Sequence, residues 1–344
     1  MPRAAEVWVI RVVIAHHAAR GPYLADAAPP DEPLANPRAR KMMSRAAYLA
    51  ALALADVMRA LGLSADERAR AGYFLGVGGS AGSLEDVGAL LDASIIDGAF
   101  SLPAFGDRGL PACNPLLAFQ LMNNFTMCHG AILEGLGGPN GALFSRGAGT
   151  VAAIAEAAHA VATGECELAI AGGADVATHP VTLAELARDG FLARGLVPAD
   201  GAGLIALRAG AAAGAAGDVV LEGAAHASGR GRPLDDALDD ALDDALADAL
   251  ARAGRGSIAE PDVVVLAPWG PPAADALRSY AAARFPGART SDTGTRGDAL
   301  AASPALAVID AARVLQATPG GRALVLALGV DGDPGAVLLA QEAA

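Results

Sequence analysis

The stretch that decides the fold runs from residue 138 to residue 176 and reads GPNGALFSRGAGTVAAIAEAAHAVATGECELAIAGGADV. It opens with a Gly-Pro-Asn turn, and the short apolar run through Phe144 predicts a strand. A glycine-rich corner at 145–149 leads into small residues at helical spacing up to Thr163, and the apolar run before Asp175 predicts a second strand. Strand, helix and strand joined by short turns are typical of a layered α/β fold.

The flanking sequence extends this pattern toward the N-terminus. Apolar patterning predicts strands at 7–14 and 71–76 and helices at 41–61 and 115–135, with a further strand at 203–208. The proline-rich, polar segment 22–40 is expected to be a loop. The first half of the chain therefore contains alternating strands and helices.

A second series of elements begins near Asp218. Strands are predicted at the runs DVVLEG, DVVVLAPWG, RALVLALG and GAVLLAQ, and helices at 234–250, 272–284 and 299–316. The order of elements resembles that of the first half, although no sequence repeat is visible. We therefore predict two halves, residues 1–217 and 218–344.

Composition restricts the class of protein. The 344 residues are 53% hydrophobic and carry a net charge of −13, which argues against a disordered chain and against a nucleic-acid-binding protein. The three cysteines cannot form a disulfide framework and suggest a reducing compartment. No apolar run is long enough to predict a membrane span, so we expect a cytoplasmic protein.

Several segments together resemble the β-ketoacyl-acyl-carrier-protein synthases of the thiolase-like fold. They are KMMSRAAYLAALALADVMRALGL (41–63), RAGYFLGVGGSAG (70–82), NNFTMCHGAILEGLGGPN (123–140), ECELAIAGGAD (165–175) and DGAGLIAL (200–207), with Asp200 in the family's acidic place. The similarity is good over residues 41–206 and looser elsewhere. It implies two pseudo-repeated βαβαβ halves that form a five-layer αβαβα sandwich.

The resemblance also implies a chemistry, a decarboxylative Claisen condensation. In the family, a Cys at a helix N-terminus takes up the acyl chain as a thioester, because the helix end lowers the pKa of its thiol. Two His side chains then stabilise the enolate, and a Lys supports the second His. A loop that carries a Phe gates the cavity.

This chain departs from the family at each of these positions. Gly147 stands where the Cys belongs, seven residues after Asn140. Pro268 takes the place of the first His, Asp298 that of the second His and Thr293 that of the Lys. Asp298 would repel a developing enolate, although a protonated Asp298 could donate one hydrogen bond. Val330 stands where the gating Phe should be.

A count of residues supports the same conclusion without an alignment. The chain has six His, the last of them His226, whereas both catalytic His of the family belong to the C-terminal half. Its only lysine is Lys41. The C-terminal half therefore cannot supply the family's catalytic His and Lys.

Other reactive side chains offer weak replacements. Ser145 and Thr150 lie near Gly147, but the sequence shows no base for them. Cys128 and His129 are adjacent, and neighbouring positions on a helix point about 100° apart, so a buried structural pair is favoured over a catalytic one.

We expect neither a metal nor another cofactor. The Cys and His show no zinc spacing. The aspartates of the segment 234–250 lack the turn glycine and the terminal Glu of a calcium loop, so this segment is expected to be a solvated helix.

The resemblance leaves one function that needs no catalytic residues. In type II polyketide systems, an active ketosynthase pairs with an inactive relative, the chain-length factor, which lines one end of the acyl tunnel. We therefore expect a chain-length-factor-like partner of an active ketosynthase, in polyketide, aryl polyene or fatty-acid-like biosynthesis, working with an acyl carrier protein. The candidate tunnel or interface residues are Phe119, Met122, Phe125, Met127 and Phe144, for which plain core packing is the alternative.

Two other functions stay open. One is a divergent 3-oxoacyl-ACP synthase or acyltransferase with relocated catalytic residues. The other is a homodimer that binds an acyl chain or a carrier protein without turnover. Whether the chain is an enzyme is therefore not decided by the sequence.

Overall fold

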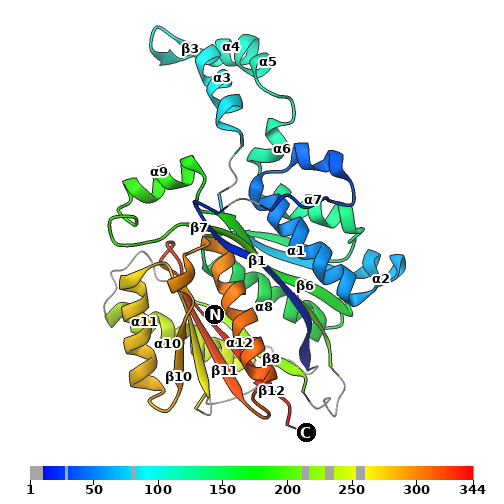
Figure 1. The fold of residues 1–344 in the computed structure, drawn as a ribbon, viewed down its shortest axis with the longest axis vertical. Coiled ribbons are helices and arrows are strands. Elements are labelled where there is room, and N and C mark those ends of the chain that lie inside the picture. The colour runs from blue at the N-terminus through cyan, green and yellow to red at the C-terminus, as the bar shows by residue number, and fades with distance from the viewer. Residues whose placement is uncertain are drawn as a thin grey trace, which may run out of the picture.

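A computed structural model gives the structure of the chain. It describes residues 11–27, 30–79, 82–210, 217–228, 236–252 and 260–343. A single ten-stranded sheet runs through the molecule in the order β10-β9-β11-β12-β8-β1-β7-β6-β2-β5. Its two ends are covered by different helices (Figure 1).

Each half of the chain supplies five strands of this sheet. The first half contributes β1 (Val12–Leu24), β2 (Gly72–Val77), β5 (Asn140–Phe144), β6 (Leu168–Val176) and β7 (Ala199–Ala209). The second half contributes β8 (Val219–His226), β9 (Val263–Pro268), β10 (Arg289–Asp292), β11 (Arg322–Leu328) and β12 (Pro334–Gln341). In both halves the strands lie in the order third, second, fourth, fifth, first, with the fifth antiparallel to both of its neighbours. The halves therefore share one topology, and we keep their division at residues 217 and 218 as a proposal.

The two sets of strands meet where β1 lies beside β8. Among the described residues, this junction consists of Val12 and Val13 of β1 paired with Leu221 and Val220 of β8. On either side of this junction the sheet folds over a pair of helices, α8 (Ala148–Ala162) and α12 (Ser303–Gln316). The thiolase-like α/β fold is confirmed, with the central helices enclosed between two sheet layers.

Helices also cover the two outer faces. The outer helices on the first half are α1 (Arg45–Leu61) and α7 (Phe125–Glu134), and those on the second half are α10 (Asp236–Arg252) and α11 (Pro271–Arg284). The layers follow the order helix, sheet, helix, sheet, helix (Figure 1). The five-layer sandwich expected from the resemblance is therefore present.

Alternation along the strands explains how both faces of each sheet are buried. In β9, Val263 and Val265 point into the central layer, while Val264 and Leu266 pack under the outer helices. Because both faces are apolar, these strands read as continuous hydrophobic runs, the pattern that predicted them.

Small residues allow the central helices to approach the sheets. Helix α8 is buried over nearly its whole length, mostly by Ala. At Gly173 of β6, a Cβ atom would overlap the Ala301 carbonyl and the Thr150 hydroxyl. Small residues at these positions are thus a packing requirement of the central layer.

Several element bounds differ from the sequence-based expectation. Strand β1 continues through Leu24, into the predicted loop, because it pairs with β7 along most of its length, while residues 7–10 lie outside the described residues. The helix predicted at 115–135 is two helices, α6 (Leu117–Leu121) and α7, since the backbone is extended at Met122. Helix α1 begins only at Arg45, where Ser44 caps it, and a 3-10 helix (Pro37–Met42) precedes it.

The helix predicted at 234–250 is also found, as α10. Asp243 and Asp244 are exposed and Leu242 and Leu246 are buried, as a solvated amphipathic helix requires. The first residues of the predicted helix, Leu234 and Asp235, lie outside the described residues.

An arm projects from the body between β2 and α6, and the sequence analysis made no prediction for it. Its elements are α3 (Leu84–Ser94), β3 (Ile95–Ile96), β4 (Ala99–Phe100), α4 (Leu102–Ala104), a π-helical turn (Phe105–Gly109) and α5 (Leu110–Ala112). The arm stands clear of the layers at the top of Figure 1. Seven of its large apolar side chains are exposed: Leu84, Leu91, Ile95, Ile96, Phe100, Leu102 and Leu110.

Candidate functional site

The candidate site lies at the N-terminus of α8, where the chain leaves β5. Gly147 precedes the helix, and the first amides of α8 point toward the end of β11 in the other half. Asp331, from the loop after β11, accepts a hydrogen bond from the Ala148 amide (3.3 Å) and another from the Ser145 hydroxyl. The Ser145 Oγ in turn accepts one from the Gly149 amide (3.0 Å). A carboxylate of the chain itself therefore caps this helix end.

The space around Gly147 is filled by backbone. A Cβ atom at this position would lie 2.7 Å from the Gly329 Cα and 3.1 Å from the Asp331 Oδ1. Real Cβ atoms do not approach backbone carbon this closely, so a larger residue would have to displace the loop that carries Gly329. The helix end that could stabilise a thiolate instead holds Asp331.

Two further carboxyl groups are buried beside this loop. Asp175, at the end of β6, is fully buried, and its burial raises its pKa to about 7, although the Val176 amide and the nearby Arg146 favour the charged form. Burial likewise raises the pKa of Asp298 to about 6. Burial also raises the pKa of Asp331, against the opposing effect of the Ser145 hydrogen bond.

These three carboxyl groups influence one another. The charge of Asp298 raises the pKa of Asp175, and the charge of Asp331 raises that of Asp298. The guanidinium of Arg146 also pairs with Glu185, at 2.7 Å. A cluster that accumulates negative charge disfavours an enolate, whereas the family's chemistry needs a site that stabilises one. In the described ranges, no group of three or more His, Cys, Asp or Glu side chains is arranged to hold a metal ion.

Asp298 has a structural role at the start of the α12 region. Its Oδ1 accepts hydrogen bonds from the Ser303 hydroxyl (2.6 Å) and the Leu300 amide (2.9 Å). Its Oδ2 is buried and has no hydrogen-bond partner among the described residues. A proton on this carboxyl group therefore belongs on Oδ2.

The other expected positions are also occupied by structural contacts. The Thr293 hydroxyl donates to the Leu266 carbonyl of β9 (2.9 Å), so it is not available as a donor in the site. Pro268 ends β9 beside Leu328 of β11, and Val330 packs against the outer core of the second half. The identification of Gly147, Pro268, Asp298 and Thr293 as the family's catalytic positions stays a prediction.

Cys128 and His129 face different surroundings. The His129 ring packs against Phe125 with centroids 5.4 Å apart, and burial lowers its pKa. Cys128 lines a pocket beside Tyr73, and burial raises the pKa of its thiol. A neutral thiol that lies apart from the imidazole is a poor nucleophile, so this geometry favours the structural interpretation.

The candidate tunnel residues divide into surface and core. Phe119, Met122 and Phe144 are exposed, and Phe119 packs edge-on against Phe125 with centroids 5.0 Å apart. Met127 is buried in the outer core of the first half. Core packing therefore accounts for Met127 but not for the three exposed side chains.

Sequence analysis missed Asp331, Asp175 and Tyr73. The signal for Asp331 is the acidic, glycine-rich turn GVDGD, in which only Val330 was assigned a role from the sequence. Asp175 ends an apolar strand, a place where an acidic residue suggests a buried polar contact. Tyr73 reads as an ordinary strand residue, and nothing in its sequence context distinguishes it.

The comparison with protein families identifies the chain. Residues 11–225 match the N-terminal domain of the β-ketoacyl synthases, which is more than half of the chain. The fold defines a thiolase-like protein, and this match shows that the chain belongs to the β-ketoacyl synthase family. The comparison with curated proteins found no significant match.

Solved structures agree with this fold. The chain is similar to the ishigamide ketosynthase/chain length factor, with a TM-score of 0.72 at 16% identity over 96% of this chain and 99% of that one. It is also similar to an oxazolomycin ketosynthase domain of Streptomyces albus, with a TM-score of 0.68 at 19% identity over 96% of this chain and 75% of that one. A third similar structure is a type II polyketide synthase acyl carrier protein in complex with its ketosynthase bound to the hexaketide, with a TM-score of 0.71 at 15% identity and coverages of 96% and 99%.

The crowding at Gly147 predicts that a Cys alone does not restore a nucleophile. The Gly147→Cys variant should unfold at a lower temperature than the native chain, because its Cβ meets Gly329. It should also gain no thioester when incubated with an acyl thioester, as measured by intact mass. The native chain, which keeps Cys113, Cys128 and Cys166, is the control. Full acylation mapped to residue 147 would contradict the proposed crowding.

Asp298 predicts a pH dependence of stability. Its pKa is about 6 in the folded chain and 3.8 ordinarily, so its favourable contribution to folding is complete below about pH 4 and is lost as the pH rises through 6. In Asp298→Asn the amide oxygen keeps both hydrogen bonds. Between pH 4 and 8 the titration of Asp298 should lower the free energy of unfolding of the native chain by up to about 3 kcal/mol. Asp298→Asn should lack this part of the decrease.

Urea denaturation at several pH values measures this effect. Asp275→Asn on the exposed face of α11 is the control and should follow the native curve. Parallel curves for Asp298→Asn and the native chain would show that Asp298 does not titrate in this range.

Proposed function

We propose that the chain is a non-catalytic, chain-length-factor-like subunit that pairs with an active ketosynthase. This proposal rests on the N-terminus of α8. The backbone at Gly329 leaves no space for a side chain at Gly147, and Asp331 accepts a hydrogen bond from the Ala148 amide. The fold around this helix is kept, and a kept fold without a nucleophile suits a partner of the catalyst. The match to a ketosynthase/chain length factor structure is consistent with this role.

The free edge of the sheet offers a surface for the partner. Strand β5 is the last strand in the sheet and pairs only with β2 among the described strands. Phe144 at its end is 64% exposed, and Phe119 and Met122 expose further apolar area. An unpaired edge beside apolar side chains is typical of a surface that a second chain covers.

A basic segment supports an acyl carrier protein as a second partner. In this acidic chain, Arg38, Arg40 and Lys41 lie together in an exposed turn before α1. Gln120 of α6 donates to the Lys41 carbonyl (3.1 Å), which ties this turn to the segment of the candidate tunnel residues. Such a patch attracts a partner with an acidic surface, and we expect the carrier protein to present one.

One observation favours the second candidate, a divergent acyl-transfer enzyme. Ser145 donates a hydrogen bond to Asp331, so a hydroxyl and a carboxylate are paired at a helix N-terminus. The same hydroxyl oxygen accepts from the Gly149 amide, which fixes it as part of the cap. We therefore assign the pair a structural role.

An acyl thioester probe separates the two candidates. The proposal expects no mass increase for the native chain after incubation. A covalent adduct that disappears in Ser145→Ala but persists in Cys128→Ala would establish the enzyme and would contradict the non-catalytic role.

Co-expression with a ketosynthase encoded beside the chain tests the pairing. We expect a complex of one chain of each kind, with the ketosynthase more soluble and more active than when it is expressed alone. Phe144→Glu should reduce recovery of the complex by about tenfold or more, since it places a charge on the apolar edge. Ser279→Glu, on exposed α11 at the opposite outer layer, adds the same charge and should leave recovery unchanged.

Two results would overturn this proposal. One is a ketosynthase that is equally soluble and active without the chain. The other is a stable homodimer of the chain that forms no complex with the ketosynthase, which is the result expected of a binding protein without a synthase partner.

A further inference from the structure

The pocket beside Tyr73 and Cys128 lies on the outer side of the first half, away from the α8 N-terminus. Helix α7 forms one wall and strands β2 and β5 form the other, and the turn at Gly138 closes one end. Its volume is about 210 Å³. A cavity of about 150 Å³ is enough to hold benzene, so this pocket has room for about eight to ten non-hydrogen atoms.

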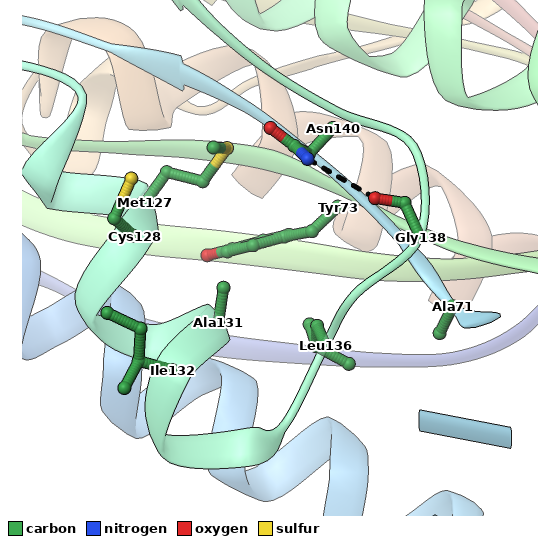
Figure 2. Close-up of a pocket in the computed structure, with 9 residues that line it drawn as sticks. All are labelled: Ala71, Tyr73, Met127, Cys128, Ala131, Ile132, Leu136, Gly138 and Asn140. Carbon is green, nitrogen blue, oxygen red and sulfur yellow. Dashed lines mark hydrogen bonds between the residues drawn. The ribbon is translucent and has the colours of Figure 1, made fainter. Parts of the chain in front are cut away.

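The lining is mostly apolar, and its polar side chains are the buried Tyr73 hydroxyl, the Cys128 thiol and the Asn140 amide at the rim. Met127, Ala131, Ile132 and Leu136 contribute apolar surface, and Figure 2 shows the phenol of Tyr73 reaching between Cys128 and Ala131. Ile132 at the mouth is 75% exposed, so the pocket opens to solvent. The thioether of Met127 lets one wall adapt to the shape of a ligand.

The Tyr73 hydroxyl group is the feature that points to a ligand. The Tyr73 side chain is only 1% exposed, and its hydroxyl has no hydrogen-bond partner among the described residues. A buried hydroxyl without a partner is unfavourable, and native proteins rarely keep one. The hydrogen bond drawn in Figure 2 is made within the wall, where the Asn140 amide donates to the Gly138 carbonyl at 3.2 Å.

The protonation states in the pocket define the chemistry of the ligand. Burial raises the pKa of the Tyr73 phenol, so the hydroxyl keeps its proton and acts as a donor at neutral pH. Burial also raises the pKa of the Cys128 thiol, which disfavours covalent attack by this residue. A neutral wall whose buried, unpartnered donor is the Tyr73 hydroxyl suits a neutral ligand with one acceptor oxygen.

We propose that this pocket binds a small, neutral, mostly apolar molecule whose carbonyl or hydroxyl oxygen accepts a hydrogen bond from Tyr73. Binding is non-covalent, and it does not require the partner role proposed above. The side chains that would discriminate among ligands are Tyr73, through its hydroxyl, and Met127 and Ile132, through the shape of the wall.

Two probes of the same shape test the proposal. Acetophenone carries the acceptor oxygen, and α-methylstyrene has a methylene group in its place. The readout is the alkylation rate of Cys128 by iodoacetamide, followed by peptide mass, because a ligand in the pocket covers this thiol. Cys113 is half-buried elsewhere and serves as the internal control.

The expected result has three parts. Acetophenone should slow the alkylation of Cys128 but not that of Cys113, and α-methylstyrene should require about fivefold to tenfold higher concentration for the same protection. In Tyr73→Phe the difference between the probes should disappear. Tyr73→Phe should also be at least as thermally stable as the native chain, because it removes an unpartnered hydroxyl.

Tyr280→Phe is the matched control variant. The Tyr280 hydroxyl donates to Asp243 at 2.6 Å, so its removal should lower stability and leave the preference between the probes intact. The proposal is overturned if both probes protect Cys128 equally, if neither protects it, or if Tyr73→Phe keeps the preference. It is also overturned if protection of Cys128 rises with protein concentration in the absence of a probe, since a second chain would then cover the pocket.

Discussion

The burial of α8 between two sheets is the constraint on which the rest of the structure depends. A helix end exposed to solvent can give its free amides to water, but the end of α8 faces the other half of the chain. Its first amides must therefore find acceptors inside the protein. Ser145 and Asp331 supply them, and the packing of Gly147 against Gly329 leaves no space for a different arrangement.

This constraint bears on the proposed absence of a nucleophile. Our proposal places the family's reactive Cys at this helix end, which in this chain is capped by the carboxyl group of Asp331. Asp298 and Asp175 add further acidic groups, and their raised pKa values reflect burial without a full set of compensating partners. The centre of the molecule is thus built for packing, while most of the large exposed apolar side chains lie on the arm, on or next to α6 and at the free edge of β5.

The regular elements could be predicted because both faces of the sheets are buried. Strands such as β9 and β11 appear as unbroken apolar runs, and the helices follow as small-residue or amphipathic segments. The arm could not be predicted in this way, since its short helices bury little and its large side chains are exposed, so no regular period marks it. The extension of β1 depends on pairing with β7, a contact between residues far apart in sequence.

The candidate site likewise contains features that the sequence predicts and features that depend on contacts between distant segments. The sequence alone determined the layered α/β fold and the absence of His after His226, because residue types and apolar periods are local properties, and it predicted Gly147 in place of the nucleophile. Only the tertiary structure revealed what surrounds Gly147. The cap of α8 comes from Asp331, 183 residues away from Ala148, and the Tyr73 pocket forms where α7 lies over β2. Both depend on which distant segments the sheet brings together, and strand order is not written in any single stretch of the chain.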